Sequence, residues 1–347
     1  MILYLRSIQF IPVNSGTIGH FVLDSEKVIL NIEQMRMQGT LISPILVLEP
    51  RISNLYFVQI LRRAGFRVVP NFPSSFIHAV LKKMFRYYRW RTKVLMDKSP
   101  LLVSDLHDRK PLHEFSEREI SVGENFLNRL GVNSEDKIAC CVFRDFGYDI
   151  AMNEIDYELK QGYRITPLSY FKPVVSLLLD LDFKVIRMGR HNKDRLQIDS
   201  ANFVDISDHP SENSDFLDFY IFARSAFTFS TGSGIDALAT FFRKPTCFLN
   251  ITYAHPIPNS KLWPVILLCD YLNETDSSRV PVNEVLSDKF TNIWHGQISD
   301  LGIRLLPKEP KQILKAAKIF LYKINRSSVN KKLTKSKDFD VISNILY

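Results

Sequence analysis

A short run of small polar residues and glycines, Ser230-Thr-Gly-Ser-Gly234, is the segment of this sequence best suited to holding a phosphate group. It follows an apolar run at 226–229 and precedes apolar residues at helical spacing, so it is expected to link a strand to a helix. Hydroxyl groups, accessible backbone N–H groups and the positive end of a helix all favour an anion. The alternative is an ordinary turn that caps a helix. The predicted phosphate contacts are Ser230, Thr231, Gly232, Ser233 and Gly234.

A second polar segment, Phe143-Arg-Asp-Phe-Gly-Tyr-Asp149, follows another predicted strand at 137–143. The planar guanidinium of Arg144 suits two-point contacts with phosphate oxygens. Asp145 and Asp149 are candidate catalytic carboxylates, able to orient Arg144 or to accept hydroxyl groups of a sugar. An exposed structural ion pair is the alternative.

Arg187 and Gly189 end the next predicted strand, at 183–187. Carboxyl ends of parallel strands meet at one edge of a sheet, and ligands bind there. We therefore expect Arg144, Arg187 and Gly189 to converge with the Ser/Gly segment in a single crevice.

A candidate general base lies in the first half of the chain, in Gly16-Thr-Ile-Gly-His20. Histidine titrates near neutral pH, so His20 is suited to accepting a proton if it faces the second half. Asp24 and Glu26 are acidic alternatives, and a purely structural histidine is also open. The acidic residues between 205 and 218 match no established ligand spacing, so neither a metal nor a separate cofactor is expected.

Strands that alternate with helices predict an α/β protein with parallel sheets. The 347 residues exceed what one core usually fills. We expect two Rossmann-like, doubly wound domains, at 1–135 and 136–325, facing each other across a cleft. The Lys-rich remainder, 326–347, is expected to be a mobile basic tail.

Composition restricts the partners. The net charge of +8 favours an anionic partner. A basic segment with interleaved aromatic residues, Lys82–Lys93, has the composition of a surface that binds anionic membranes; a solvated basic face is the alternative. The four cysteines form no CxxC pair, so we expect reduced thiols. The sequence also has no long apolar run, and we expect a cytoplasmic protein. Peripheral association with a membrane is a further expectation. Nucleic acid is not an expected partner.

Several short motifs occur in an order that resembles a family of bacterial surface-polysaccharide glycosyltransferases, of the O-antigen or capsule type. They are Gly16-Thr-Ile-Gly-His20, Arg144-Asp145, Tyr163-Arg164, Val185-Ile-Arg-Met-Gly189, Ser214-Asp-Phe-Leu-Asp218, Ser230-Thr-Gly-Ser-Gly234 and Lys244-Pro-Thr-Cys-Phe-Leu-Asn250.

The resemblance implies a GT-B fold and metal-independent transfer of a sugar from a nucleotide-sugar donor to a glycan or lipid-linked acceptor. It places Arg144, Arg187 and Ser230 to Gly234 at the donor, and Gly19 with His20 at the cleft. Two alternatives stay open. One is a nucleotide-sugar epimerase or hydrolase on the same fold, and the other is a non-catalytic protein that binds an anion or a membrane.

Overall fold

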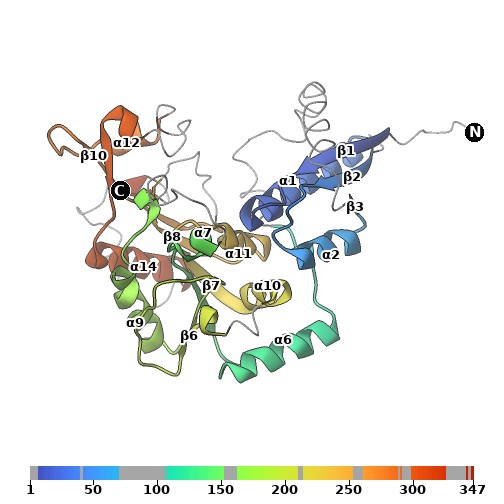
Figure 1. Cartoon of the computed structure of the whole chain (residues 1–347), viewed down its shortest axis with the longest axis horizontal. Helices are drawn as coiled ribbons and strands as arrows, with labels where there is room; N and C mark the ends of the chain where they lie inside the picture. Colours follow the sequence, from blue (N-terminus) through green and yellow to red (C-terminus); the bar gives the residue numbers. More distant parts are fainter. Residues whose placement is uncertain are drawn as a thin grey trace, which may run out of the picture.

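The computed structural model describes residues 7–39, 42–69, 106, 108–151, 162–209, 214–252, 261–287, 290, 298–325, 341–342 and 345–347. The basic segment Lys82–Lys93 lies outside the described residues, so its predicted role at a membrane stays a prediction. Figure 1 shows the described chain as two α/β units, a smaller one that carries α1 and α2 and a larger one around a broad sheet.

The first unit is built on three parallel strands in the order β1-β2-β3. The strands are β1 (Ser7–Val13), β2 (Ile42–Leu48) and β3 (Arg67–Val69), and the helices between them are α1 (Ile18–Met37) and α2 (Leu55–Arg63). Asn54 starts α2 by accepting a hydrogen bond from the backbone N–H of Phe57 at 2.8 Å. This is the first α/β unit predicted from the sequence.

The second unit is built on a sheet with the order β12-β13-β9-β8-β7-β4-β5-β6. All pairs in it are parallel except β12 with β13. Its strands are β4 (Ile138–Val142), β5 (Lys184–Arg187), β6 (Phe203–Asp205), β7 (Ser225–Ser230), β8 (Thr246–Ile251), β9 (Val265–Leu268), β12 (Val341–Ile342) and β13 (Ile345–Leu346). A separate antiparallel pair joins β10 (Asp270–Asn273) to β11 (Ile303–Leu306).

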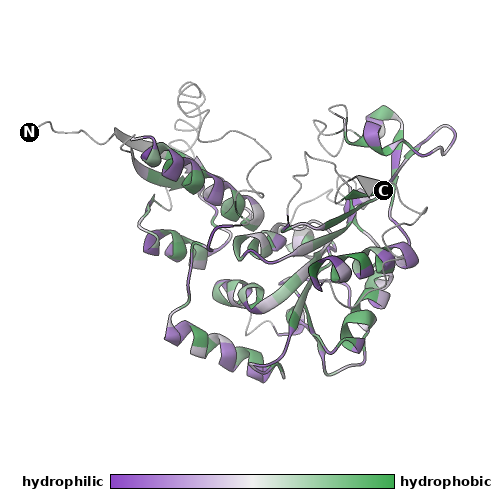
Figure 2. Cartoon of the chain, turned by 180° about the vertical axis from the view of Figure 1, so that it is seen from behind, coloured by the Kyte–Doolittle hydropathy of each residue, from purple (hydrophilic) through white to green (hydrophobic). Residues whose placement is uncertain are grey.

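Helices cover both faces of this sheet. The helices of this unit are α6 (Glu117–Arg129), α7 (Gly147–Ala151), α9 (Lys172–Asp180), α10 (Asp215–Arg224), α11 (Ala237–Phe241), α12 (Val282–Val285) and α14 (Pro310–Asn325). All five residues of β4 are buried, and its adjacent cysteines divide between the faces: Cys140 packs with α10 and α11, and Cys141 with α9 and α14. Figure 2 shows the largely apolar strands between helices, several of which carry both apolar and polar residues. The doubly wound α/β class is therefore confirmed.

The end of the chain differs from the mobile basic tail predicted for 326–347. Strand β13 extends the large sheet beside β9, and the side chain of Tyr347 is fully buried. The guanidinium of Arg279 lies 4.2 Å from the centre of the Tyr347 ring. Apolar residues at the end of a Lys-rich stretch thus complete a sheet edge, which composition alone does not reveal.

The two units are in closer contact than two domains across an open cleft. One apolar core runs through both, and its centre is the ring cluster of Phe21, Phe57, Phe219 and Phe241. The domain boundary predicted near residue 136 assigns α6 to the first domain, but α6 also packs on α10 of the second unit. There, Glu124 of α6 accepts hydrogen bonds from the side chains of Tyr220 and Arg224 of α10. Among the described residues, no helix combines the length and the apolar character needed to cross a bilayer.

Candidate functional site

The candidate site lies where the large sheet changes its winding direction. From β4 the chain proceeds to β5 and β6 on one side, and then returns to β7, β8 and β9 on the other. In open α/β sheets, such a switch point leaves a ligand crevice outside the carboxyl ends of the two central strands. Arg144 follows β4 and the Ser230–Gly234 segment follows β7, so the topology brings these two predicted elements together.

Hydrogen bonds join the two strand ends directly. The backbone N–H of Arg144 donates to Thr231 Oγ1 at 2.9 Å, and the backbone N–H of Thr231 donates to the carbonyl of Val142 at 3.0 Å. These bonds hold the Ser/Gly segment against residues 142–144 at the end of β4.

The segment 230–236, here called the switch loop, satisfies part of its own polar groups. The hydroxyl of Ser230 donates to Asp236 Oδ2 at 2.5 Å, and the same oxygen accepts the backbone N–H of Ser233 at 2.8 Å. Ser230 is fully buried and Thr231 nearly so. The hydroxyls of Ser230 and Thr231, which were predicted to contact phosphate, therefore make internal bonds. Of the five predicted contacts, Ser233 is half-buried and Gly234 is exposed.

The positive helix end at this loop comes from the first unit. The helix predicted to start after Ser233 is a 3₁₀ turn, Gly234–Asp236, followed by the five-residue α11. Instead, the 20-residue α1 begins at the loop, since a Cβ on Gly19 would lie 2.9 Å from Gly234 Cα. Thr17 provides no side-chain cap and the first turn has no acidic residue. The leading N–H groups of α1 therefore favour an anion at the loop.

Two arginines add positive charge at the switch loop. Arg164, in the 3₁₀ turn Gly162–Arg164, donates through Nη2 to the carbonyl of Gly232 at 2.8 Å. Burial raises the pKa of Asp236 to about 6, while its hydrogen bonds and the charges of Arg164 and Arg144 lower it. The Arg164 guanidinium thus contacts the loop, and the charge of Arg144 is near enough to lower the pKa of Asp236. Arg164 was visible in the sequence as part of Tyr163-Arg164, but no regular element predicted there placed it at this edge.

Arg187 has a different environment from the one predicted. Its side chain is fully buried, with Nη1 2.8 Å from Asp205 Oδ2 and Nη2 3.2 Å from Asp145 Oδ2. It also donates to the carbonyl of Asp194 at 2.5 Å. Arg187 thus ties the ends of β4, β5 and β6 together beneath the rim and is not exposed to a ligand. Gly189 has φ +135°, and a Cβ there would meet Asn192 Oδ1 at 2.2 Å, so this glycine serves the turn.

Asp145 also has a structural environment. Its carboxylate accepts backbone N–H groups from Gly147 at 2.8 Å, Lys193 at 2.8 Å and Asp194 at 3.1 Å. Together with Arg187, these bonds occupy the carboxylate predicted to take part in catalysis. Asp149 lies in α7, and its side chain is outside the described part of the structure.

His20 lies in the first turn of α1, one residue from the Gly19–Gly234 contact, and 71% of its side chain is exposed. Its Nδ1 is 3.8 Å from Asp24 Oδ2, and Asn14 Nδ2 donates to the same carboxylate oxygen at 2.9 Å. The other acidic alternative to His20, Glu26, is buried and paired with Arg243 at 2.9 Å, which gives it a structural role.

The acidic residues between 205 and 218 are paired with arginines where the structure describes them. Asp208 lies 2.8 Å from Arg195, while Asp215 and Asp218 lie 2.7 Å and 2.5 Å from Arg190. Within the described ranges, no three His, Cys, Asp or Glu side chains are grouped as metal ligands.

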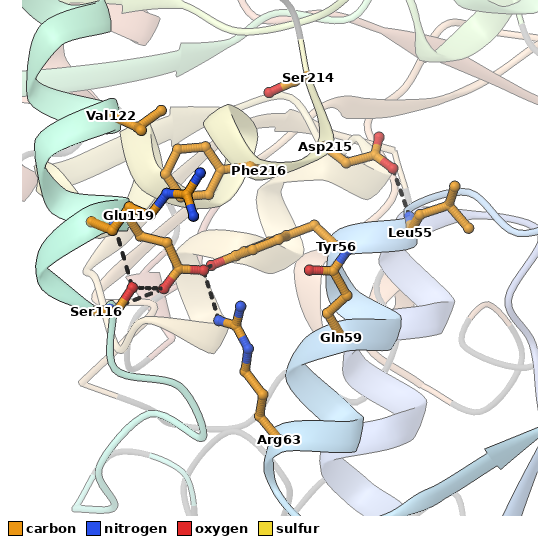
Figure 3. Close-up of a pocket in the computed structure, with 11 residues that line it drawn as sticks. Leu55, Tyr56, Gln59, Arg63, Ser116, Glu119, Val122, Ser214, Asp215 and Phe216 are labelled. Carbon is orange, nitrogen blue, oxygen red and sulfur yellow. Dashed lines mark hydrogen bonds and ion pairs between the residues drawn. The ribbon is translucent and has the colours of Figure 1, made fainter.

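A hollow of about 580 Å³ lies between α2, α6 and α10, and none of the predicted site residues lines it (Figure 3). Inside it, Glu119 Oε1 accepts from Arg63 at 2.7 Å and from the hydroxyl of Tyr56 at 2.9 Å. At its edge, Asp215 Oδ2 accepts the backbone N–H of Leu55 at 2.6 Å. These bonds connect the two units, so the hollow is first of all part of their interface.

No protein-family model matches the chain, and no curated protein sequence matches it. Among solved structures, it is similar to Escherichia coli ADP-heptose lipopolysaccharide heptosyltransferase II, with 11% identity, a TM-score of 0.46, and 91% of this chain and 99% of that chain covered. It is also similar to E. coli heptosyltransferase WaaC with ADP, at 14% identity and a TM-score of 0.36, covering 73% of this chain and 89% of that one. Because both TM-scores are below 0.5, the α/β assignment depends on the sheet order described above and not on these similarities.

Proposed function

We propose that this protein is a glycosyltransferase of GT-B type that moves a sugar from a nucleotide-sugar donor to a glycan or lipid-linked acceptor in bacterial surface-polysaccharide synthesis. One observation carries the proposal: the β4/β7 switch point, where the switch loop, Arg144, Arg164 and the uncapped start of α1 meet. Such a crevice suits the diphosphate of a nucleotide-activated group. The sugar in the proposal comes from the motif resemblance.

The reaction follows from where negative charge develops. As the acceptor oxygen bonds to the anomeric carbon, the bond from that carbon to the diphosphate breaks, and its electron pair stays on the phosphate oxygen. Arg144, Arg164 and the N–H groups of α1 stabilise this developing charge. His20, beside the same helix end, accepts the proton of the acceptor hydroxyl. Positive charge from the chain itself makes metal-independent transfer the expected chemistry.

The acceptor belongs with the first unit, because His20 follows Gly19, which touches the switch loop, and Asp24 lies one turn further along the same helix. Binding of an anionic membrane surface through Lys82–Lys93 would bring a lipid-linked acceptor close. That part of the proposal depends on charge and composition alone.

The test begins with thermal-shift and calorimetric titrations of UDP, GDP, ADP and CMP against the purified protein. Arg144→Ala and Arg164→Ala should each weaken the nucleotide diphosphate that binds best by roughly tenfold to a hundredfold, because each removes a charge-assisted contact of about 1.5–3 kcal/mol. Arg304→Ala, which removes an exposed arginine on β11, is the matched control and should leave affinity unchanged.

Incubation with sugar forms of the same nucleotide then separates the three functions. Release of nucleotide only with an acceptor extract supports transfer, whereas acceptor-independent release supports a hydrolase or epimerase. If wild-type protein binds none of the four nucleotides, or if both arginine variants bind as tightly as wild type, the assignment of this crevice is wrong.

A further inference from the structure

The carboxylate of Asp24 lies between the β1–α1 loop and the exposed ring of His20. Asn14, the first residue after β1, donates through Nδ2 to Asp24 Oδ2 at 2.9 Å, and His20 Nδ1 lies 3.8 Å from the same oxygen. The carboxylate is the more enclosed partner, with 30% of its side chain exposed against 71% for His20. A fixed carboxylate thus lies behind an accessible imidazole.

We propose that Asp24 is a positioning residue, held by Asn14, which orients the His20 imidazole through Nδ1 and leaves Nε2 to take the acceptor proton. This inference rests on the proposed function. It gives Asp24 a role different from that of an alternative base, because the carboxylate acts through the ring. A carboxylate at Nδ1 fixes the tautomer in which Nδ1 carries the hydrogen and Nε2 has the free electron pair.

The proton balance supports this arrangement. When the acceptor oxygen bonds to the anomeric carbon, its proton moves to Nε2, and the ring becomes an imidazolium whose charge the Asp24 carboxylate stabilises. The separation of 3.8 Å exceeds a hydrogen bond. Catalytic contacts are often long without substrate and shorten in the complex, so this separation suits a ligand-free site.

Several charged groups act on Asp24 besides the hydrogen bond from Asn14. Burial raises the pKa of Asp24, whereas the hydrogen bond from Asn14 and the charges of His20 and Lys27 lower it, and Glu49 raises it again. Glu49 itself accepts the backbone N–H of Gly16 at 3.1 Å, which holds the loop that carries Asn14. His20 follows Gly19 in the chain and therefore borders the Gly19–Gly234 contact.

The kinetic test is a double-mutant cycle in the nucleotide-release assay, with the best donor from the panel above. Asp24→Asn should lower kcat by roughly tenfold to a hundredfold, less than the 10²–10⁴-fold typical of losing a general base, and should leave the dissociation constant of the donor nucleotide unchanged. In a His20→Asn background, Asp24→Asn should have no further effect, because its role passes through the ring. Equal losses in both backgrounds overturn the inference.

Glu33→Gln is the matched control, because it removes an exposed carboxylate from the same helix, where Glu33 pairs with Arg109. This variant should keep the wild-type kcat. If Glu33→Gln lowers kcat as much as Asp24→Asn does, the effect is one of helix charge, and the inference fails.

A readout without substrate separates this inference from the proposed function. The Asp24 carboxyl is followed by ¹³C NMR and assigned from its loss in Asp24→Asn. Imidazoles are positively charged at the acidic pH where carboxylates titrate. His20→Asn should therefore raise the pKa of Asp24, and Glu33→Gln should not. An unchanged Asp24 titration refutes the pairing whatever the activity, whereas absence of turnover with every donor refutes the proposed function and leaves the pairing to be decided by this titration.

Discussion

Gly19 of the first unit and Gly234 of the second lie in direct backbone contact. A Cβ on Gly19 would stand 2.9 Å from Gly234 Cα, and one on Gly234 would stand 3.2 Å from the backbone nitrogen of Gly19. A side chain at Gly19 would force the backbones apart, and one at Gly234 would require a shift of a few tenths of an ångström, so α1 begins against the switch loop because both residues are glycine. The contact therefore determines how near the leading N–H groups of α1 come to Arg144 and Arg164.

Gly19→Ala is expected to push α1 away from the switch loop and to weaken binding of a nucleotide diphosphate. Overpacking of this kind costs about 1–3 kcal/mol. Since Gly→Ala inside a helix otherwise stabilises a protein by roughly 0.5–1 kcal/mol, a lower melting temperature would itself show the clash. Thermal unfolding and calorimetric titration measure the two effects.

The control for this prediction is Gly162→Ala. The nearest atom to a Cβ at position 162 is 3.9 Å away, in the Phe146 ring, so the added methyl group has room. We expect its stability to remain close to that of wild type. A Gly19→Ala protein as stable as Gly162→Ala, with wild-type nucleotide affinity, would show that the two units separate easily.

Arg187→Met should destabilise the protein strongly. The substitution leaves the buried carboxylates of Asp145 and Asp205 without their shared cation, and breaking a buried pair in this way costs about 3–5 kcal/mol. Arg195→Met is the matched control, because Arg195 lies 3.9 Å from the same Asp205 but is half exposed, and an exposed pair contributes about 0–1 kcal/mol. The free energies of unfolding, measured in urea, should differ accordingly, and equal values would contradict the structural role of Arg187.

The sequence predicts the elements of the large sheet well because buried parallel strands are short apolar runs bounded by turn residues. The strands predicted at 183–187 and 226–229 correspond to β5 and β7. The sequence also predicts that Arg144 and the Ser/Gly segment lie close together, because the carboxyl ends of parallel strands lie at one edge of a sheet regardless of how their side chains are oriented.

The direction of each side chain at those ends could not be predicted in the same way. Arg187 points into the sheet rim because Asp145 and Asp205, 42 and 18 residues away, enclose its guanidinium. Likewise, the anion-favouring helix at the loop is α1, more than 200 residues earlier in the chain, and only tertiary packing places it there. The local sequence pattern thus determines where helices and strands form, whereas contacts between distant parts of the chain determine which polar side chains remain free to bind a ligand.

Activity is expected to survive chelation. The positive groups at the switch loop are Arg144, Arg164 and the start of α1, and these can stabilise a leaving diphosphate without a cation. Nucleotide release in the presence of EDTA should match release in added magnesium or manganese. Loss of release in EDTA, restored by either metal, would contradict a metal-independent mechanism.

The stability of the switch loop should depend on pH through Asp236. Burial raises the pKa of this carboxyl from 3.8 to about 6 in the folded protein. Because the folded state holds the proton more tightly, the stabilisation from this group is complete below pH 3.8 and is lost as the pH rises to about 6. Each unit of difference between the two pKa values corresponds to about 1.4 kcal/mol.

Asp236→Asn isolates this effect, because the amide oxygen can still accept the Ser230 hydroxyl and the Ser233 N–H but cannot ionise. Urea unfolding at several pH values between 4 and 7 should show wild type losing stability relative to the variant as the pH rises. All other titrating groups are common to both proteins, so their contributions cancel in the difference. A difference that stays constant over this range would mean that the hydrogen bonds and the charges of Arg144 and Arg164 outweigh burial and keep the carboxyl ionised. If wild type instead gains stability relative to Asp236→Asn as the pH rises, the pKa of Asp236 in the folded protein lies below 3.8, and the prediction is wrong.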